Sequence, residues 1–316
     1  MEKTFKTHLE QIEILKAKGL CIPNVNEALK ILNRENYYNL INGYKQLFLD
    51  SHSPECFKKD ATFSELHSLF SFDRHLRNTL IGYFLLFETN IKSRFSYRFC
   101  EANSEVDAYL MLKNYNLQHA SAHLLPKLLA NFSKITHKHK YEKRNSNLKH
   151  YLTSNSHAPL WIFVNFMTFG QIKLMFTHAQ SSLKNKVAQD FSHEYENSYQ
   201  QKIFISSDML DSILHATNFF RNVCAHEERL YNYKLALVPK TAKITKILNL
   251  EPDLVSKGNL FTVVALLKLV VPRNDYQSLK NLLFSLFFHY ESHFHSTTFD
   301  HILQSMGFPE DWYQLI

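Results

Sequence analysis

Three residues near position 225 combine a permanent positive charge with a group that titrates near neutral pH. They are Arg221, Asn222 and His226, within the segment RNVCAH. An arginine guanidinium donates paired, charge-assisted hydrogen bonds to phosphate oxygens, and an imidazole can pass a proton to or from a ribose hydroxyl. Together these groups can support RNA cleavage without a metal ion. The bare pattern RxxxxH is weakly specific, because a chain with 18 histidines meets it easily by chance.

Charged residues also fall inside apolar helical stripes, where they need a partner. With a step of about 100° per residue, the expected helix over 63–99 carries three such residues: Asp73, Arg77 and Glu88. Arg221 falls inside the stripe of a second expected helix, over 207–230. Ionised groups in a core are costly unless they are paired. Two interpretations stay open: a buried network of these charges that fixes helix packing, or a cleft in which Arg221 meets an anionic substrate.

Positive charge is concentrated in residues 126–150. This segment holds seven lysines and arginines against one glutamate, which accounts for most of the net charge of +7. Tyrosines are interleaved, so both phosphate contacts and base stacking are available to RNA. The predicted RNA-binding residues are Lys138, Lys140, Lys143 and Arg144. The alternative is a solvated basic loop.

The glycine pattern excludes the common nucleotide-binding loops. The chain has only six glycines in 316 residues, and they are too far apart for GxGxxG, GxxxxGK[ST] or GxSxG. Rossmann and P-loop enzymes and α/β-hydrolases of the usual pattern are therefore not expected. Few glycines and weak strand signals favour helices.

The hydrophobic periodicity predicts an all-α protein. Helices are expected over 8–20, 25–50, 63–99, 160–169 and 207–230, with two or three more in 241–316. Three consecutive parts are predicted: an N-terminal helical segment (1–60), a helical core with a basic insertion near 126–150 (61–240), and a C-terminal helical extension (241–316). Tyr37 and Tyr38 are expected in the core.

The chain shows no signal for membrane, secretion or metal. No apolar run approaches about 18 residues, and the first residues lack an apolar signal core. Four single cysteines are typical of reduced thiols, so a cytoplasmic protein is expected. His289 and His293 lie four apart, but HYESH is not HExxH and no cysteine cluster accompanies it. We predict no metal site and no cofactor.

Several short segments occur in the order found in a known family. They are QIEILK (11–16), NYY (36–38), GY (43–44), FDRHLR (72–77), PLW (159–161), FG (169–170) and RNVCAH (221–226). This ordered set resembles the Abi-type (AbiD/AbiF-like) abortive-infection family of the HEPN superfamily of helical ribonucleases. The sequence departs from the family pattern at two positions. Glu227 stands where the family commonly has a second histidine, and Lys92 stands where it commonly has an arginine.

The resemblance implies a fold and a chemistry. The core over 61–240 would be a HEPN-like helical bundle, with Arg221 and His226 matching the Rx4–6H motif and Asn222 the polar residue after the arginine. The implied reaction is attack of a ribose 2′-hydroxyl on the adjacent phosphate, which leaves a 2′,3′-cyclic phosphate and a 5′-hydroxyl. His226 would transfer protons and Arg221 would stabilise charge. The supporting polar network would comprise Asp73, Arg77 and Glu88.

The resemblance also implies partners. The protein would be a phage-defence toxin restrained by an antitoxin, expected to be a structured non-coding RNA. On an ideal helix Arg221 and His226 point about 140° apart, so a site shared across a homodimer is expected. The alternative is a non-catalytic RNA-binding or assembly protein in which Arg221 only completes an ion network.

Overall fold

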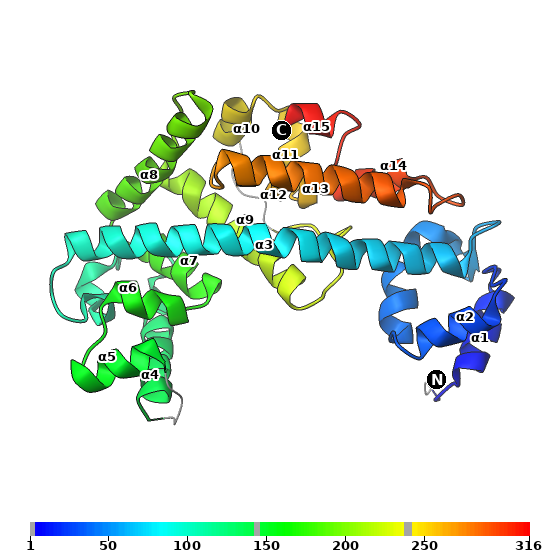
Figure 1. Cartoon of the computed structure of the whole chain (residues 1–316), viewed down its shortest axis with the longest axis horizontal. Helices are drawn as coiled ribbons and strands as arrows, with labels where there is room; N and C mark the ends of the chain where they lie inside the picture. The colour runs from blue at the N-terminus through cyan, green and yellow to red at the C-terminus, as the bar shows by residue number, and fades with distance from the viewer. Residues whose placement is uncertain (1–3, 142–145, 237–241) are drawn as a thin grey trace. The chain divides into compact units, whose positions relative to one another are not determined.

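The computed structural model describes residues 4–141, 146–236 and 242–316, and helices dominate it (Figure 1). The prediction of an all-α protein is confirmed. The sheet in these ranges is one small antiparallel hairpin of β1 (Leu49–His52) and β2 (Glu55–Phe57). None of the helices within them is both long and apolar enough to cross a membrane.

The α-helices follow one another with mostly short connections. They are α1 (His8–Ala17), α2 (Val25–Leu32), α3 (Phe63–Ala102), α4 (Leu125–Tyr141), α5 (Asn147–Ser154), α6 (Leu160–Phe163), α7 (Phe169–His178), α8 (Ser181–Tyr199), α9 (Ser207–Ala225), α10 (Ala242–Leu248), α11 (Pro252–Ser256), α12 (Leu260–Leu267), α13 (Arg273–Glu291), α14 (Phe299–Met306) and α15 (Trp312–Leu315). Short turns of 3-10 or π-helix fill some connections: η1 (Tyr38–Asn42), η2 (Lys45–Phe48), η3 (Ala108–Leu110), η4 (Leu112–Asn114), η5 (Ala122–Leu124) and η6 (Val164–Phe166).

The prediction of one helix over 25–50 is wrong. Helix α2 ends at Leu32, and η1 is a separate π-helical turn. The Asn36 side-chain oxygen accepts hydrogen bonds from the backbone N–H of Tyr38 (2.9 Å) and of Asn39 (3.2 Å). Such local bonds from asparagine compete with helix continuation, so the chain starts a new turn here.

Two further helix predictions differ from the structure. The single helix expected over 160–169 is wrong, because Thr168 caps a new helix, α7, in a capping box with Gln171. Thr168 Oγ1 accepts from the Gln171 backbone N–H at 3.2 Å, and Gln171 Oε1 accepts from the Thr168 N–H at 2.8 Å. The part of the chain from residue 242 holds α10 to α15, which are more numerous than the two or three helices expected.

The chain forms two compact units, each assembled from separate stretches. Unit 1 comprises 1–81, 223–234 and 278–315, and unit 2 comprises 82–222, 235–277 and Ile316. Helices α3, α9 and α13 contribute residues to both units. The division into three consecutive parts stays a prediction, and its second boundary, 240/241, lies outside the described residues.

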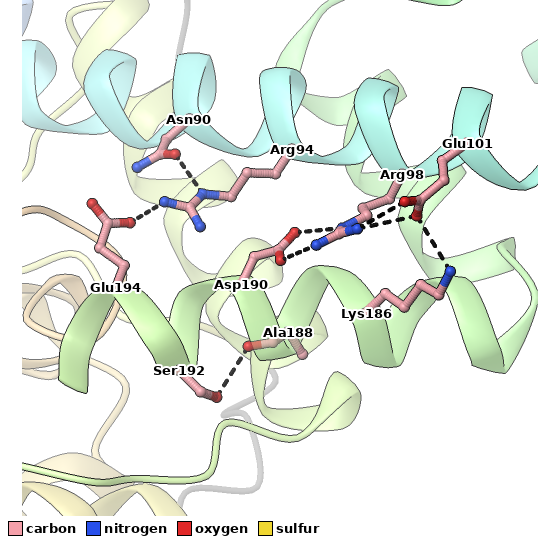
Figure 2. Close-up of polar contacts among 9 residues, drawn as sticks. All are labelled: Asn90, Arg94, Arg98, Glu101, Lys186, Ala188, Asp190, Ser192 and Glu194. Atoms are coloured by element: carbon pink, nitrogen blue, oxygen red, sulfur yellow. Dashed lines mark hydrogen bonds and ion pairs between the residues drawn. The ribbon is translucent and has the colours of Figure 1, made fainter. Parts of the chain in front are cut away.

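In unit 2, ion pairs join the second half of α3 to α8 (Figure 2), and a cation–π contact adds to them. Arg98 donates two hydrogen bonds to Asp190, from Nε at 2.9 Å and from Nη2 at 2.6 Å. Arg94 donates to Glu194, and its guanidinium lies 4.5 Å from the centre of the Phe191 ring. Bidentate pairing and stacking over a ring both restrict the arginine side chain, which fixes the register of the two helices.

In unit 1, a buried carboxylate joins the start of α3 to the segment that follows α13. The Glu65 side chain is fully buried, and it accepts hydrogen bonds from the backbone N–H groups of His295 and Ser296, both at 2.8 Å. The N–H of Thr62 donates to its other oxygen at 3.0 Å. Burial opposes ionisation of Glu65, but these hydrogen bonds hold its pKa below the ordinary value.

We expect Glu65 to make unit 1 sensitive to acid. Its lowered pKa in the folded state means that it stabilises the fold above about pH 4.5, and that this stabilisation is lost as the pH falls through the lowered pKa. The Glu65→Gln variant should lose about 1–3 kcal/mol at neutral pH, and its difference from the wild type should shrink below pH 4.5. Chemical denaturation across this pH range measures the effect. Glu13→Gln is the control, because Glu13 forms an exposed ion pair with Lys16. An equal loss of unfolding free energy in the two variants would contradict the stabilising role of the buried Glu65.

Candidate functional site

A cavity of about 540 Å³ lies within unit 1 and is lined mainly by polar side chains. Its lining comes from the turn after α2, from α3, and from the segment that follows α9. The charged residues that line it are Glu35, Arg74, Arg77, His226, Glu227, Glu228 and Arg229. The uncharged ones are Asn36, Tyr38, Asn39, Asn42, Gly43, Tyr44 and Phe70. Three arginines and three glutamates therefore surround one histidine.

His226 lies just beyond the C-terminal end of α9. The backbone N–H of Glu228 donates to the Val223 carbonyl at 3.0 Å, and the N–H of Glu227 to the Cys224 carbonyl at 3.4 Å. Glu227 has a φ of 54°, so α9 ends in a Schellman motif with a glutamate at the left-handed position where glycine is usual. The prediction of a helix continuing to residue 230 is wrong, because the backbone turns to positive φ at Glu227.

The His226 imidazole is exposed on the cavity. No hydrogen bond to its ring occurs within the part of the chain that the structure describes. An imidazole in this setting is accessible to a substrate and can exchange protons with it.

Asp73 holds the segment after α9 against α3. It is fully buried, and its oxygens accept from the backbone N–H groups of Leu230 (3.0 Å) and Tyr231 (2.7 Å). Arg77 Nη1 donates to Asp73 at 2.5 Å, and the Tyr44 hydroxyl donates at 2.7 Å. Burial raises the pKa of Asp73 above its ordinary value, and these four donors offset only part of that effect.

Two more contacts complete the wall of the cavity. Arg229 donates to the Gly43 carbonyl, which joins the segment after α9 to the turn before β1. Arg74 donates two hydrogen bonds to Glu35, at 2.9 and 2.8 Å. Both arginines are therefore oriented by partners.

Arg221 and Glu88 belong to unit 2. Arg221 Nε lies 3.2 Å from Glu88 Oε2, and the arginine side chain is one-quarter exposed. The other Glu88 oxygen accepts from Lys92 at 2.8 Å, and Lys92 also donates to the Met167 carbonyl at 2.6 Å. Asn222, the next residue of α9, is half-buried.

The predicted polar residues therefore form two groups rather than one. Asp73 and Arg77 form a pair in unit 1, whereas Glu88 pairs with Arg221 in unit 2. Arg221 and His226 fall in different units. The Asp73–Arg77 pair is buried, whereas Arg221 is one-quarter exposed beside the buried Glu88.

Sequence reasoning missed the turn over 36–44 as part of the site. Its NYY and GY segments carry the family resemblance, but no charge or spacing in them indicates a cavity. Tyr38 was expected in the core, and this is wrong, because its side chain is 67% exposed. Arg74 and Arg229 were also missed, since an isolated arginine has no distinguishing pattern in sequence.

The basic segment is helical where it is described. Lys138 and Lys140 are exposed on α4, and the same helix buries Leu128 and Phe132. Lys140 Nζ lies 5.6 Å from the centre of the exposed Tyr141 ring. Lys143 and Arg144 lie outside the described residues.

The placement of the buried thiol Cys224 and of the His, Cys, Asp and Glu side chains bears on thiol and metal chemistry. In the described ranges no three side chains of His, Cys, Asp or Glu gather so that they could hold a metal ion. Cys224 is buried, and burial together with the charge of Asp73 raises the pKa of its thiol to about 12. The thiol therefore stays protonated at neutral pH and is a poor nucleophile.

A matched pair of tyrosines tests the Asp73 arrangement. Tyr44 and Tyr231 stack with ring centres 5.7 Å apart, but only the Tyr44 hydroxyl reaches Asp73, whereas the buried Tyr231 hydroxyl has no partner among the described residues. We expect Tyr44→Phe to cost about 1.5–3 kcal/mol of unfolding free energy and Tyr231→Phe to cost nothing, because an unpaired buried hydroxyl gives no stabilisation. Urea denaturation measures both, and equal effects would refute the role of the hydroxyl.

Comparison with known proteins places the chain in a family. The family model described as Abi-like protein matches residues 30–232. This range contains the cavity-lining turn, Asp73 and the segment after α9. No curated protein and no solved structure matches the chain. Because the family model covers well over half of the sequence, the chain belongs to the Abi-like proteins, an abortive-infection family of phage defence.

Proposed function

We propose that this phage-defence protein is a metal-independent endoribonuclease of the HEPN type that acts as a toxin. The observation that carries the proposal is the position of His226. Its imidazole is exposed on a cavity with three arginines, and no described residue occupies its ring nitrogens. The RxxxxH spacing assigns Arg221 as its companion.

The proposed reaction is an internal transesterification. The ribose 2′-oxygen forms a bond to the adjacent phosphorus while the bond from phosphorus to the 5′-oxygen breaks. His226 takes the proton from the 2′-hydroxyl and returns a proton to the leaving 5′-oxygen, so that the imidazole ends in its starting state. The products are a 2′,3′-cyclic phosphate and a 5′-hydroxyl, so no water or cofactor is consumed.

Arg221 would stabilise the charge that develops on the phosphate. Glu88 contacts it through Nε, and a guanidinium carries two further nitrogens that donate to oxygens in a fixed fork. Glu88 would thus act as a positioning residue. Asn222 would orient the phosphate or the imidazole.

The partners follow from the same proposal. A toxin must be restrained in its own cell, and a structured non-coding RNA is the antitoxin that we propose. A homodimer is proposed because HEPN-type relatives pair two motif helices and this chain carries one such motif. The test of the dimer is the oligomeric state of the active protein.

One observation favours a second function. The pairing of Arg221 with Glu88 gives the arginine a structural use that needs no substrate. A non-catalytic RNA-binding or assembly protein would keep this pair and would not need His226. The two candidates differ in the effect of removing the imidazole.

We expect His226→Ala and Arg221→Ala each to relieve growth arrest on expression. Loss of a general acid–base group should lower RNA cleavage by about 10²–10⁴-fold, measured on purified protein with end-group analysis of the products. Arg221→Lys should also fail, because an ammonium cannot give the bidentate contact. The exposed His123→Ala is the matched control, and melting curves verify folding. A folded His226→Ala protein that stays toxic would rule out the mechanism.

We also expect RNA binding to depend on the basic helix α4. Changing Lys138 and Lys140 to glutamine should weaken binding and flatten the slope of log K against log[salt] by about 0.7 for each lost single-strand contact. Titrations at several salt concentrations measure this slope. Lys30→Gln combined with Lys59→Gln removes the same charge from other exposed positions. If the two double variants give the same slope, Lys138 and Lys140 do not contact RNA and serve only the solubility of the protein.

A further inference from the structure

We propose that the cavity of unit 1 binds one unpaired nucleotide of RNA, with its base stacked on Tyr38 and its edge contacted by Asn39 and Asn42. The assignment of this nucleotide as a neighbour of the cleaved phosphate rests on the proposed function. The binding itself does not, because it follows from the lining of the cavity.

Tyr38 has the features of a stacking platform. Its side chain is 67% exposed although it lines a cavity, and among the described residues it has no aromatic contact. An exposed ring at a cavity offers a flat apolar face on which a ligand can stack. Unpaired bases stack on such rings, which is a common way for proteins to hold single-stranded RNA.

The turn that carries Tyr38 also presents amides. It is a π-helical turn, and such turns occur often at functional sites. Asn36 uses its side-chain oxygen to hold the turn, whereas Asn39 is exposed and Asn42 is half-buried on the cavity. An amide offers a donor and an acceptor together, which matches the edge of a base.

The charge of the lining favours a base and ribose over a cluster of phosphates. Arg74 is already bound to Glu35 by two hydrogen bonds, and Glu227 and Glu228 add two carboxylates. Carboxylates repel phosphates but accept hydrogen bonds from base amino groups and ribose hydroxyls. A volume of about 540 Å³ is also in the usual range for a small-ligand site.

A larger side chain at position 43 would test the cavity directly, because Gly43 lines it. Its φ of −68° is ordinary for any residue, and a Cβ added there would meet nothing within 4 Å. Neither backbone conformation nor packing therefore requires glycine at this position. A leucine side chain would enter the open space that Gly43 lines and occupy the place of the base.

The test measures binding without cleavage. Full-length protein is titrated with fluorescein-labelled single-stranded oligonucleotides in which each ribose carries 2′-fluoro, since these lack the attacking hydroxyl. We expect Tyr38→Ala and Gly43→Leu to raise Kd by about 10-fold or more, and Tyr38→Phe to retain binding because the ring remains. Asn39→Ala with Asn42→Ala should reduce the difference in Kd between the four homopolymers. Tyr97→Ala removes a tyrosine of similar exposure, 64%, and should have no effect.

The outcomes separate this proposal from the nuclease. If folded Tyr38→Ala and Gly43→Leu bind as tightly as the wild type, or if the wild type binds no single strand, the nucleotide subsite is wrong. If His226→Ala stays toxic while Tyr38→Ala loses binding, the nuclease mechanism fails and the subsite stands. A loss of binding that is equal for Tyr38→Ala and Tyr97→Ala would also overturn the subsite, because it would reflect a general effect.

Discussion

The site in unit 1 depends on the burial of one carboxylate. Asp73 has no access to water, so its charge is tolerated only while every oxygen is hydrogen-bonded. Its donors come from three stretches that are far apart in sequence: Tyr44 before the hairpin, Arg77 on α3, and the backbone after α9. Losing any one stretch leaves a buried charge short of partners, which is more costly than losing a surface contact. Asp73 therefore couples the position of the His226 segment to the folding of the whole unit.

The end of α9 shows how stability and function compete at this place. A Schellman motif satisfies the last carbonyls of the helix, but it needs a residue at positive φ. Glycine adopts that conformation without strain, whereas a side chain there costs about 1–2 kcal/mol. Glu227 occupies it with a φ of 54° and lines the cavity. The chain thus keeps a carboxylate beside His226 at the expense of some helix stability, a trade that is common at functional sites.

The sequence allowed the all-helical class to be predicted, and also the need of Asp73, Arg77 and Glu88 for partners, because both follow from periodicity and the cost of burying charge. It did not allow the partners to be identified. The backbone N–H groups that bind Asp73 have no signature in side-chain pattern. The π-helical turn was missed because Asn36 overrides the helical periodicity of its neighbours, and the cavity was missed because its lining joins residues almost 200 positions apart. Helix ends were the least predictable feature, since Glu227 stands where glycine would have marked the stop.

The discontinuous composition of unit 1 has a consequence for the stage of synthesis at which the unit can fold. A ribosome releases the chain from the N-terminus, and a domain folds once all of its parts have emerged. Asp73 and Glu65 both lie in residues 1–81. The backbone donors of Asp73 lie in 223–234, and those of Glu65 lie in 278–315, so neither carboxylate can be satisfied until these later stretches are made. The unit that carries His226 is therefore completed only after residues 278–315 have left the ribosome. A product that stops before residue 278 would leave Glu65 without these backbone donors.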